Sequence, residues 1–165
     1  MGSSNLMADK SDIRPGEVTI ELPASFDAGV YFIGRIRTPF KRREECPRST
    51  AASDATGRIE LDPRFAAGVR DLRLYSHAIL LYWMDQARRD LIQQVPGHLG
   101  HPRGIFALRS PVRPNPIALA VVELVGFEDD GSITVRTVDC VDGTPLIDIK
   151  PYFSSTDSVP DATRP

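Results

Sequence analysis

The residues best suited to chemistry lie in one short stretch, residues 109–119, which reads RSPVRPNPIAL. Its three prolines fix their own φ angles and bias the preceding residues toward extended geometry, so the stretch is predicted to be a stiff loop. Stiff loops that carry guanidinium groups bind ligands with little loss of entropy. Arg109 and Arg113 are therefore candidate ligand contacts, and Asn115 is an amide that could read a planar hydrogen-bonding edge. The alternative is a structural corner in which Asn115 satisfies nearby backbone groups.

The loop lies within a stretch of positive charge that the whole-chain average hides. Residues 91–122 contain no Asp or Glu but do contain Arg103, Arg109, Arg113, His98 and His101. The formal net charge of −2 argues against a generally basic nucleic-acid-binding surface, so we expect a local patch for an anionic ligand such as a phosphate. A solvated surface balanced by acidic residues from elsewhere in the fold is the alternative.

Three carboxylates follow in the segment DCVDGTPLIDIK, residues 139–150. Asp142 precedes a glycine, the pair favoured in the tight turn of a hairpin, so a hairpin between two paired strands is predicted there. Asp139 and Asp148 interrupt apolar runs, where an unpaired carboxylate is costly, so each is predicted to have a polar or cationic partner. For Asp148 the leading candidate is Lys150, on the same strand face. The spacing is too loose to indicate a metal site.

A histidine stands at the start of the most hydrophobic run, SHAILLYWM at residues 76–84. His77 is interpreted either as a structural group satisfied by one hydrogen bond or as a base. No serine, histidine and acid form a recognisable nucleophile signature, which argues against covalent hydrolysis.

Short β-favouring runs separated by Gly, Pro and Asp dominate the chain, and they predict a mostly β fold, either a barrel or a sandwich. Hairpin turns are expected at Asp130-Gly131 and Asp142-Gly143. One short helix is expected at residues 85–95, with Asp85 as its N-cap. The seven expected strands are residues 31–38, 57–61, 76–84, 104–108, 117–127, 132–141 and 145–152.

The length of 165 residues, with 41% hydrophobic and 25% charged residues, fits one globular domain. We expect a partly disordered N-terminal extension at residues 1–28, the folded domain at 29–153 and a loose tail at 154–165. No signal peptide or membrane span is recognised, which predicts a cytoplasmic protein. Cys46 and Cys140 form no CxxC pair and are interpreted as reduced thiols. The chain also lacks GxGxxG and GxxxxGK[ST], so the usual dinucleotide fold and the phosphate-binding P-loop are not predicted.

Several long motifs resemble a known family. IGRIRTPF, CPRS, GRIELDPRFAAGVRDLRLYSHAILL, GIFALRSPVRPNPIALA and DCVDGTPLIDIKPY occur in the order and spacing of the TsaA-like (YaeB/TrmO-type) family, over about residues 32–152. The resemblance implies a small, dimeric, non-Rossmann β-barrel with one or two short helices. It further implies an S-adenosylmethionine-dependent methyltransferase that acts on N6-threonylcarbamoyladenosine, next to the tRNA anticodon.

The resemblance also assigns residues. It implies cofactor contacts in four places along the chain: Pro47, Arg48 and Ser49; Asp85 and Gln86; Arg109 and Leu119; and Thr137, Val138 and Asp139. At one of these positions the chain departs from the family, because Ser49 replaces a glutamine. We expect tRNA contacts from Arg103, Arg113, Asn115, Asp142 and Lys150. His77 and Asp148 are the candidates for a general base, and no metal is expected.

Two departures from the family bear on the acceptor. Many bacterial relatives continue beyond the barrel into a region thought to help hold tRNA, and the segment PGHLGHPRG replaces the usual approach to the proline-rich loop. Three alternatives stay open. The first is a methyltransferase of this fold with another RNA or a small-molecule acceptor. The second is a module that binds S-adenosylmethionine or RNA without turnover, and the third is a metal-dependent hydrolase built on the aspartates.

Overall fold

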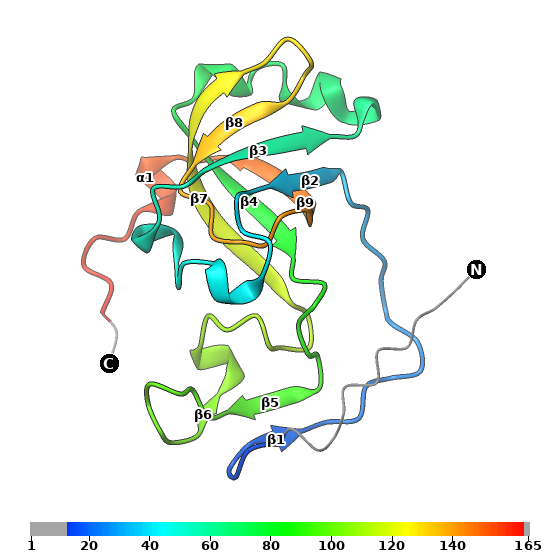
Figure 1. The fold of residues 1–165 in the computed structure, drawn as a ribbon, viewed down its shortest axis with the longest axis vertical. Coiled ribbons are helices and arrows are strands. Elements are labelled where there is room, and N and C mark those ends of the chain that lie inside the picture. The colour runs from blue at the N-terminus through cyan, green and yellow to red at the C-terminus, as the bar shows by residue number, and fades with distance from the viewer. Residues whose placement is uncertain (1–12, 164–165) are drawn as a thin grey trace. The chain divides into compact units, whose positions relative to one another are not determined.

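The computed structural model describes residues 13–163, and its central feature is a closed barrel with strand order β2-β3-β8-β7-β4-β9 (Figure 1). β2 pairs antiparallel with β3 and β9, β8 pairs antiparallel with β3 and β7, and β4 pairs antiparallel with β9. The mostly β, non-Rossmann barrel predicted from the sequence is therefore confirmed. The strands are β2 (Gly34–Arg37), β3 (Thr56–Leu61), β4 (His77–Trp83), β7 (Ile117–Phe127), β8 (Ile133–Arg136) and β9 (Thr144–Pro151).

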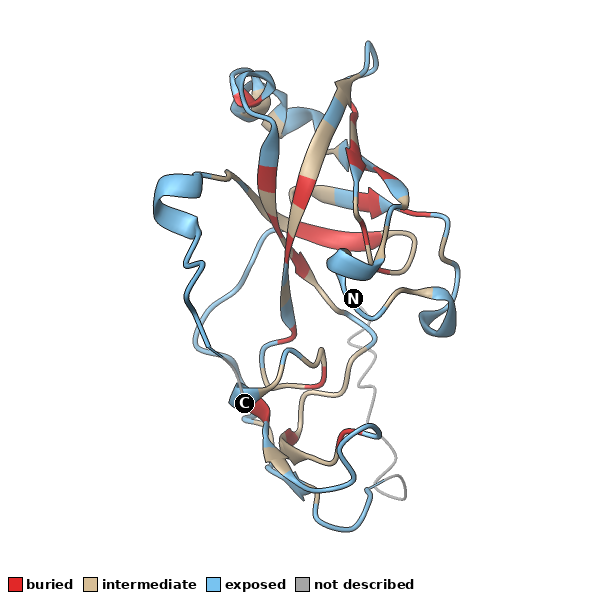
Figure 2. Ribbon diagram, turned by 90° about the vertical axis from the view of Figure 1, so that its left-hand side faces the viewer, coloured by how far each residue is buried: buried red, intermediate tan, exposed pale blue. Residues whose placement is uncertain are grey.

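Alternation along the strands fills the barrel. In β4 every second residue is buried, namely Ala78, Leu80 and Tyr82, because successive side chains of a strand point to opposite faces. Figure 2 shows the buried positions spread over the barrel strands. Ile36, Ile59, Val122, Ile133, Val135 and Leu146 complete the centre of this core, each at most 1% exposed.

Short helical turns connect the barrel strands. They are the 3₁₀ helices η2 (Arg43–Glu45), η3 (Thr50–Ala52), η4 (Pro63–Val69) and η5 (Leu72–Leu74), and the α-helix α1 (Ser154–Asp157) follows β9. η2 and η3 lie in the long connection between β2 and β3, which carries Pro47, Arg48 and Ser49.

Contacts within the chain define two compact units. The barrel unit comprises Val30–Trp83 and the chain from Ala118 onward, and the other unit comprises the N-terminal segment up to Gly29 together with Met84–Ile117. The latter, here called the loop unit, contains a three-stranded sheet of order β1-β5-β6. Its elements are β1 (Val18–Thr19), β5 (Leu91–Gln94), β6 (Arg103–Gly104) and the 3₁₀ helix η6 (Ile105–Ala107).

The helix predicted at residues 85–95 is wrong. Asp85 is no N-cap, because residues 85–87 form a turn closed by Ala87 N–H donating to Met84 O, and the chain then enters strand β5. β5 pairs on one side with β1 and on the other with β6. Pairing with the distant N-terminal segment outweighs the local helix propensity of this sequence.

Two strand predictions are also corrected. Residues 104–108 form the 3₁₀ helix η6 for most of their length, and the strand predicted at 132–141 ends at Arg136. Thr137 has φ +73°, which breaks the extended backbone. β8 pairs with β3 and β7 and not with β9, so the hairpin predicted at Asp142-Gly143 does not form, although Gly143 does adopt a turn with φ +81°. The β7–β8 hairpin at Asp130-Gly131 is confirmed.

The predicted N-terminal extension contains ordered structure within its described part. β1 lies in it, and Ile20 N–H donates to Asp90 O at 2.7 Å. Residues 1–12 of that extension and residues 164–165 of the predicted tail lie outside the described residues. The three domain boundaries stay predictions.

Candidate functional site

In the barrel unit, hydrogen bonds join the connection that carries Pro47, Arg48 and Ser49 to the 137–139 segment, and the family resemblance implies cofactor contacts in both. Ser53, at the end of the loop that carries Pro47, Arg48 and Ser49, donates its hydroxyl to Val138 O at 2.7 Å. Thr137 N–H donates to Ala55 O at 2.9 Å. The β2–β3 connection is thus fastened to the 137–139 segment, and Ser53 and Val138 are 85 residues apart in the sequence.

The backbone of the 137–139 segment is strained at its first residue. Thr137 adopts a left-handed φ of +73°, which a β-branched residue avoids and which costs about 1–3 kcal/mol. Its hydroxyl donates to Val121 O at 3.3 Å and also contacts Arg136 O, which helps hold this conformation. The strained turn ends β8 and directs Val138 into the core while Asp139 stays half-buried.

Asp139 is oriented by a residue that the sequence analysis missed. The Tyr82 hydroxyl donates to Asp139 Oδ1 at 2.6 Å, and the Tyr82 side chain is buried inside the barrel. Asp139 therefore has the polar partner that was predicted, supplied by a phenol. The signal in the sequence was an aromatic residue with a polar tip at an inward position of the run SHAILLYWM, since a buried tyrosine needs a partner for its hydroxyl.

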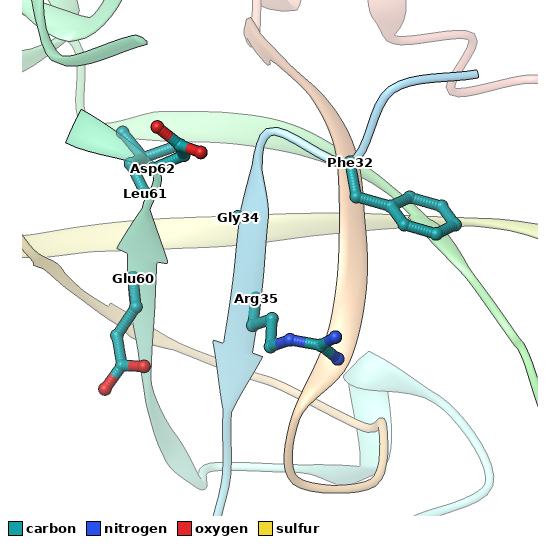
Figure 3. Close-up of a pocket in the computed structure, with 6 residues that line it drawn as sticks. All are labelled: Phe32, Gly34, Arg35, Glu60, Leu61 and Asp62. Atoms are coloured by element: carbon teal, nitrogen blue, oxygen red, sulfur yellow. The ribbon is translucent and has the colours of Figure 1, made fainter. Parts of the chain in front are cut away.

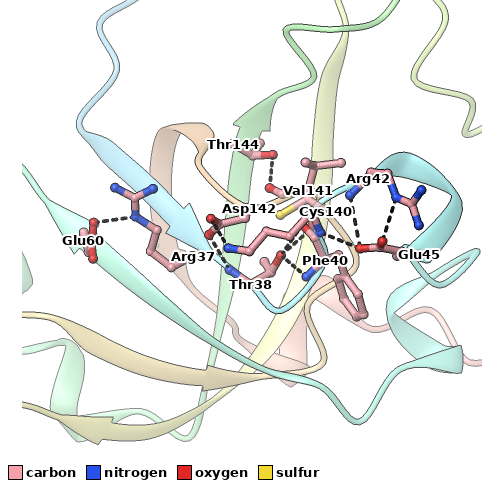
Figure 4. A network of polar contacts seen from close by, with 11 residues as sticks. Arg37, Thr38, Phe40, Arg42, Glu45, Glu60, Cys140, Val141, Asp142 and Thr144 are labelled. Carbon is pink, nitrogen blue, oxygen red and sulfur yellow. Dashed lines mark hydrogen bonds and ion pairs between the residues drawn. The ribbon is translucent and has the colours of Figure 1, made fainter.

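Asp142 fastens the start of the β2–β3 connection (Figure 4). Its Oδ1 accepts from Thr38 N–H at 3.1 Å and its Oδ2 accepts from Lys41 Nζ at 2.7 Å. Thr38 in turn donates its hydroxyl to Cys140 O at 2.8 Å, and Asp142 N–H donates to Phe40 O at 2.7 Å. Both carboxylate oxygens of Asp142 thus serve the local structure, and its expected contact to tRNA stays a prediction.

The Asp142 network predicts a pH-dependent stability. The hydrogen bond from Lys41 is the main reason that the pKa of Asp142 lies below its ordinary value. A lowered pKa in the folded state stabilises the fold above the unfolded pKa, about 3.9, and this contribution disappears as the pH falls through the folded pKa. We expect Asp142→Asn to lower the free energy of unfolding, measured by urea titration at about pH 7, and the deficit to shrink as the pH is lowered to about 3.

Lys41→Gln tests the same interaction from the other side. It should raise the pKa of Asp142 toward the ordinary value and produce a similar pH-dependent deficit. A deficit of equal size at both pH values would contradict this account, because it would indicate a loss of packing rather than of charge.

The two cysteines lie beside this network and are protonated at neutral pH. Burial raises the pKa of the Cys140 thiol to about 12. The pKa of Cys46 is also raised, mainly by burial and secondly by the nearby Asp139 carboxylate. Because the Asp139 carboxylate affects the pKa of Cys46, Asp139 lies near Cys46, the residue directly before Pro47. Neither thiol is suited to act as a nucleophile.

The candidate bases lie on β4 and β9. Asp148 forms the predicted ion pair with Lys150, with Oδ2 to Nζ at 2.8 Å. His77 is exposed, and its Nδ1 lies 2.9 Å from the Ser76 hydroxyl. Neither observation assigns a base, and both residues stay candidates.

The loop unit contains the proline-rich loop and most of the other predicted contacts. Residues 109–116 form neither helix nor strand, as predicted. Arg113 Nη2 donates to Ile105 O at 2.9 Å and to Leu108 O at 2.6 Å, which ties the loop to η6. Arg113 is half-buried, and its guanidinium has a structural role at Nη2. Arg103 is also half-buried. The exposed predicted contacts of this unit are Asp85, Gln86, Arg109 and Asn115. Leu119, on β7 of the barrel unit, is 45% exposed.

A shallow depression of about 350 Å³ lies on the barrel between β2 and β3 (Figure 3). It is lined by Phe32, Gly34, Arg35, Glu60, Leu61 and Asp62, and none of these is a predicted site residue. Arg35 is engaged in structure, since its Nη1 donates to Gly143 O at 2.8 Å. None of the candidate cofactor residues therefore lines this depression.

Residues 13–163 contain no group of three or more His, Cys, Asp or Glu side chains that could hold a metal ion. Within the same residues, none of the helices has the length and apolar character needed to cross a membrane.

Comparisons with known proteins agree with the motifs. The chain is 37% identical over 151 residues to the probable S-adenosyl-L-methionine-binding protein VirR of Rhizobium radiobacter, covering 92% of this chain and 86% of VirR. It is 37% identical over 142 residues to the tRNA (adenine(37)-N6)-methyltransferase of Escherichia coli strain K12, covering 79% of this chain and 60% of that enzyme. The crystal structure of TrmO from Pseudomonas aeruginosa superposes with a TM-score of 0.67 at 35% identity, covering 84% of this chain and 62% of that one.

These relatives differ in length. The chain spans less than two thirds of the E. coli enzyme and of the solved TrmO chain, and 35% of a probable S-adenosyl-L-methionine-binding protein of Archaeoglobus fulgidus that is 47% identical over 131 residues. The model of the tRNA-methyltransferase O N-terminal domain matches residues 35–158, most of this sequence. The barrel and its motifs together therefore establish that the chain belongs to the tRNA-methyltransferase O N-terminal domain family.

Proposed function

We propose that this protein is an S-adenosylmethionine-dependent methyltransferase whose acceptor is N6-threonylcarbamoyladenosine in the anticodon loop of tRNA. Family membership supports the reaction class, and the name of the E. coli relative supports a tRNA adenosine acceptor. The observation that carries the proposal is the bond by which Ser53, in the connection that carries Pro47, Arg48 and Ser49, meets the strained 137–139 segment.

The donor set fits the cofactor chemically. S-adenosylmethionine contains a cationic sulfonium that activates its methyl group, an amino-acid end, a ribose and an adenine. The Asp139 carboxylate, oriented by Tyr82, suits a ribose hydroxyl or a cationic group, and exposed Asp85 can do the same. Arg48 or Arg109 suits the cofactor carboxylate, and exposed Leu119 suits the adenine face.

The protein's own task in this reaction is positioning. Holding the acceptor nitrogen in line with the methyl group, with water excluded, is worth about 7–11 kcal/mol at best. The acceptor N6 must also lose its proton. His77 and Asp148 are the proposed acceptors for that proton, and Asp148 would need to act in the presence of Lys150.

The acid-free stretch supplies the proposed tRNA surface. Within the loop unit, Arg103 and Arg113 are the proposed phosphate contacts and Asn115 is a proposed substrate contact. Lys150, on β9 of the barrel unit, is a further proposed contact outside this stretch. Phosphate contacts of this kind give affinity and position without reading sequence, so they should make tRNA binding salt-dependent. We further propose that the protein is cytoplasmic and that it is a homodimer, and light scattering of the purified chain tests the dimer.

The decisive experiment has two stages. Calorimetry with S-adenosylmethionine alone should show saturable binding, and its absence would remove every methyl-transfer hypothesis. Mass spectrometry of nucleosides from tRNA incubated with protein and cofactor should then show that threonylcarbamoyladenosine gains one methyl group.

A second candidate, a binding module without turnover, is favoured by one observation. VirR, of which this chain covers 86%, has the name of a binding protein rather than of an enzyme. Cofactor binding together with unmethylated nucleosides across all tRNAs would select this candidate. Methylation of a different nucleoside would instead select another acceptor.

We expect Arg109→Ala to raise the dissociation constant for S-adenosylmethionine. The exposed guanidinium would no longer meet an anionic group of the cofactor, and a contact of that kind is worth about threefold to tenfold in affinity. Calorimetry measures the constant, and Arg70→Ala is the matched control because Arg70 is also exposed but is not a predicted contact. Equal constants for the Arg109→Ala protein and the unaltered protein would remove Arg109 from the cofactor site.

A further inference from the structure

The N-terminal segment and the proline-rich loop are connected through Arg89. Within the loop unit, Arg89 Nε donates to Pro114 O at 2.6 Å and Arg89 Nη2 donates to Asn115 Oδ1 at 3.3 Å. The same guanidinium lies over the Phe26 ring, with its central carbon 4.4 Å from the ring centroid. One planar group therefore contacts the loop with its edge and the N-terminal segment with its face.

The N-terminal segment is held where this contact requires it. β1 pairs with β5, Ile20 N–H donates to Asp90 O at 2.7 Å, and Gln93 Nε2 donates to Gly16 O at 2.7 Å. The family-model match begins at residue 35, so Phe26 and β1 lie outside the part of the chain that the family model covers. The contact of Phe26 with Arg89 thus joins a residue outside the family-model match to a residue within it.

Arg89 also fixes which way the Asn115 amide faces. A guanidinium only donates hydrogen bonds, so the atom of Asn115 that it meets is the oxygen. Among residues 13–163 the amide nitrogen of Asn115 donates to no protein group, and Asn115 is exposed. The two N–H donors are thus the part of this amide that is left to meet a ligand.

We propose that Phe26 and Arg89 are positioning residues that orient Asn115 as a hydrogen-bond donor, so that Asn115 selects an acceptor atom on the substrate. The acceptor is a carbonyl oxygen or an unprotonated ring nitrogen of a planar group. The inference deepens the proposed function and rests on it, since it takes Asn115 as a substrate contact.

The orientation is tested by NMR on the full chain, using the side-chain amide signals of Asn115, which are assigned by their loss in Asn115→Ser. Arg89→Lys keeps the charge but loses the planar fork, and Phe26→Leu keeps an apolar side chain but loses the ring face. Both variants should shift the Asn115 side-chain signals. The matched controls are Arg64→Lys and Phe65→Leu. In the barrel unit, Arg64 lies over the Phe65 ring and also binds Asp62, so these two changes should leave the Asn115 signals in place. Unshifted signals in both Arg89→Lys and Phe26→Leu would overturn the proposal.

The substrate contact is tested by kinetics. Arg89→Lys and Asn115→Asp should each raise the KM for tRNA by about threefold to tenfold with kcat little changed, because each removes about one oriented hydrogen bond. Asn115→Asp keeps an oxygen for Arg89 but has no N–H donors, so an unchanged KM in this variant would overturn the donor assignment. The variant with both changes should have a KM for tRNA no higher than that of the single variant with the higher KM, because both changes remove the same contact.

Failure of the proposed function gives a different pattern. If the unaltered protein methylates no tRNA, the proposed function fails, and the Asn115 signals still decide whether Phe26 and Arg89 orient the amide. If methylation occurs and the signals do not respond to either variant, the proposed function stands and this inference fails.

Discussion

The Asp139→Asn protein is expected to bind S-adenosylmethionine about ten to a hundred times more weakly than the unaltered protein, because a hydrogen bond to a charged group is worth about 1.5–3 kcal/mol. The substitution removes the charge but keeps an oxygen that can accept from the Tyr82 hydroxyl, so the local structure should persist. Calorimetry at fixed ionic strength measures the change, and thermal unfolding checks that the fold is retained.

The control for this experiment is Asp129→Asn, which removes one carboxylate from the exposed β7–β8 turn and should leave the affinity unchanged. Tyr82→Phe should weaken binding by about threefold to tenfold, since it leaves the charge in place but releases its orientation. If Asp139→Asn binds the cofactor as well as the unaltered protein does, Asp139 is not a cofactor contact and the proposed site loses its central residue.

Gly34→Ala is expected to lower the free energy of unfolding by about 3 kcal/mol, the upper end of the usual cost of overpacking. A Cβ on Gly34 would lie 2.3 Å from Glu60 O and 3.0 Å from Leu61 Cα, both backbone atoms of the neighbouring strand. β2 cannot move away easily, because Gly34 is in register with Leu61 of β3 on one side and with Leu146 of β9 on the other. Urea unfolding followed by circular dichroism measures the loss.

Gly68→Ala is the matched control, since a Cβ there meets nothing within 4 Å. This variant should be as stable as the unaltered protein or slightly more stable, because alanine restricts the unfolded chain. If Gly34→Ala were equally stable, the closed pairing of β2 with both of its neighbours would be wrong.

Barrel strands could be predicted from the sequence where the strand's own residues show an apolar pattern typical of β structure. The runs that became β4 and β7 have alternating or continuous apolar residues, which local periodicity detects. Residues 85–95 could not be assigned in this way, because the partner that makes Leu91–Gln94 a strand is Val18–Thr19, more than seventy residues away. The residues Asp142 and Gly143 predict a turn, and a turn forms there. They do not predict which strands pair with β9, because closure of the barrel places β2 and β4 beside it instead of β8.

The candidate site shows the same division. The family motifs pointed to Asp139 and to the Pro47–Ser49 loop, but Tyr82 and Arg89 were missed. Their importance comes from a single contact each, to Asp139 and to Asn115, that joins segments 57 and 26 residues apart. Nothing in the local sequence of Arg89 marks it, since Arg88 beside it has the same type and pairs with Asp90.

The buried thiol of Cys140, in the connection between β8 and β9, provides an internal reporter of local opening in the barrel unit. Its pKa of about 12 and its burial leave almost no thiolate accessible to an alkylating reagent while the strands are closed. Reaction at neutral pH therefore requires the surroundings of Cys140 to open, and the labelling rate follows how often that happens. Because Thr38 donates to the Cys140 carbonyl, this rate also reports on the segment where the β2–β3 connection is fastened, without any probe being attached.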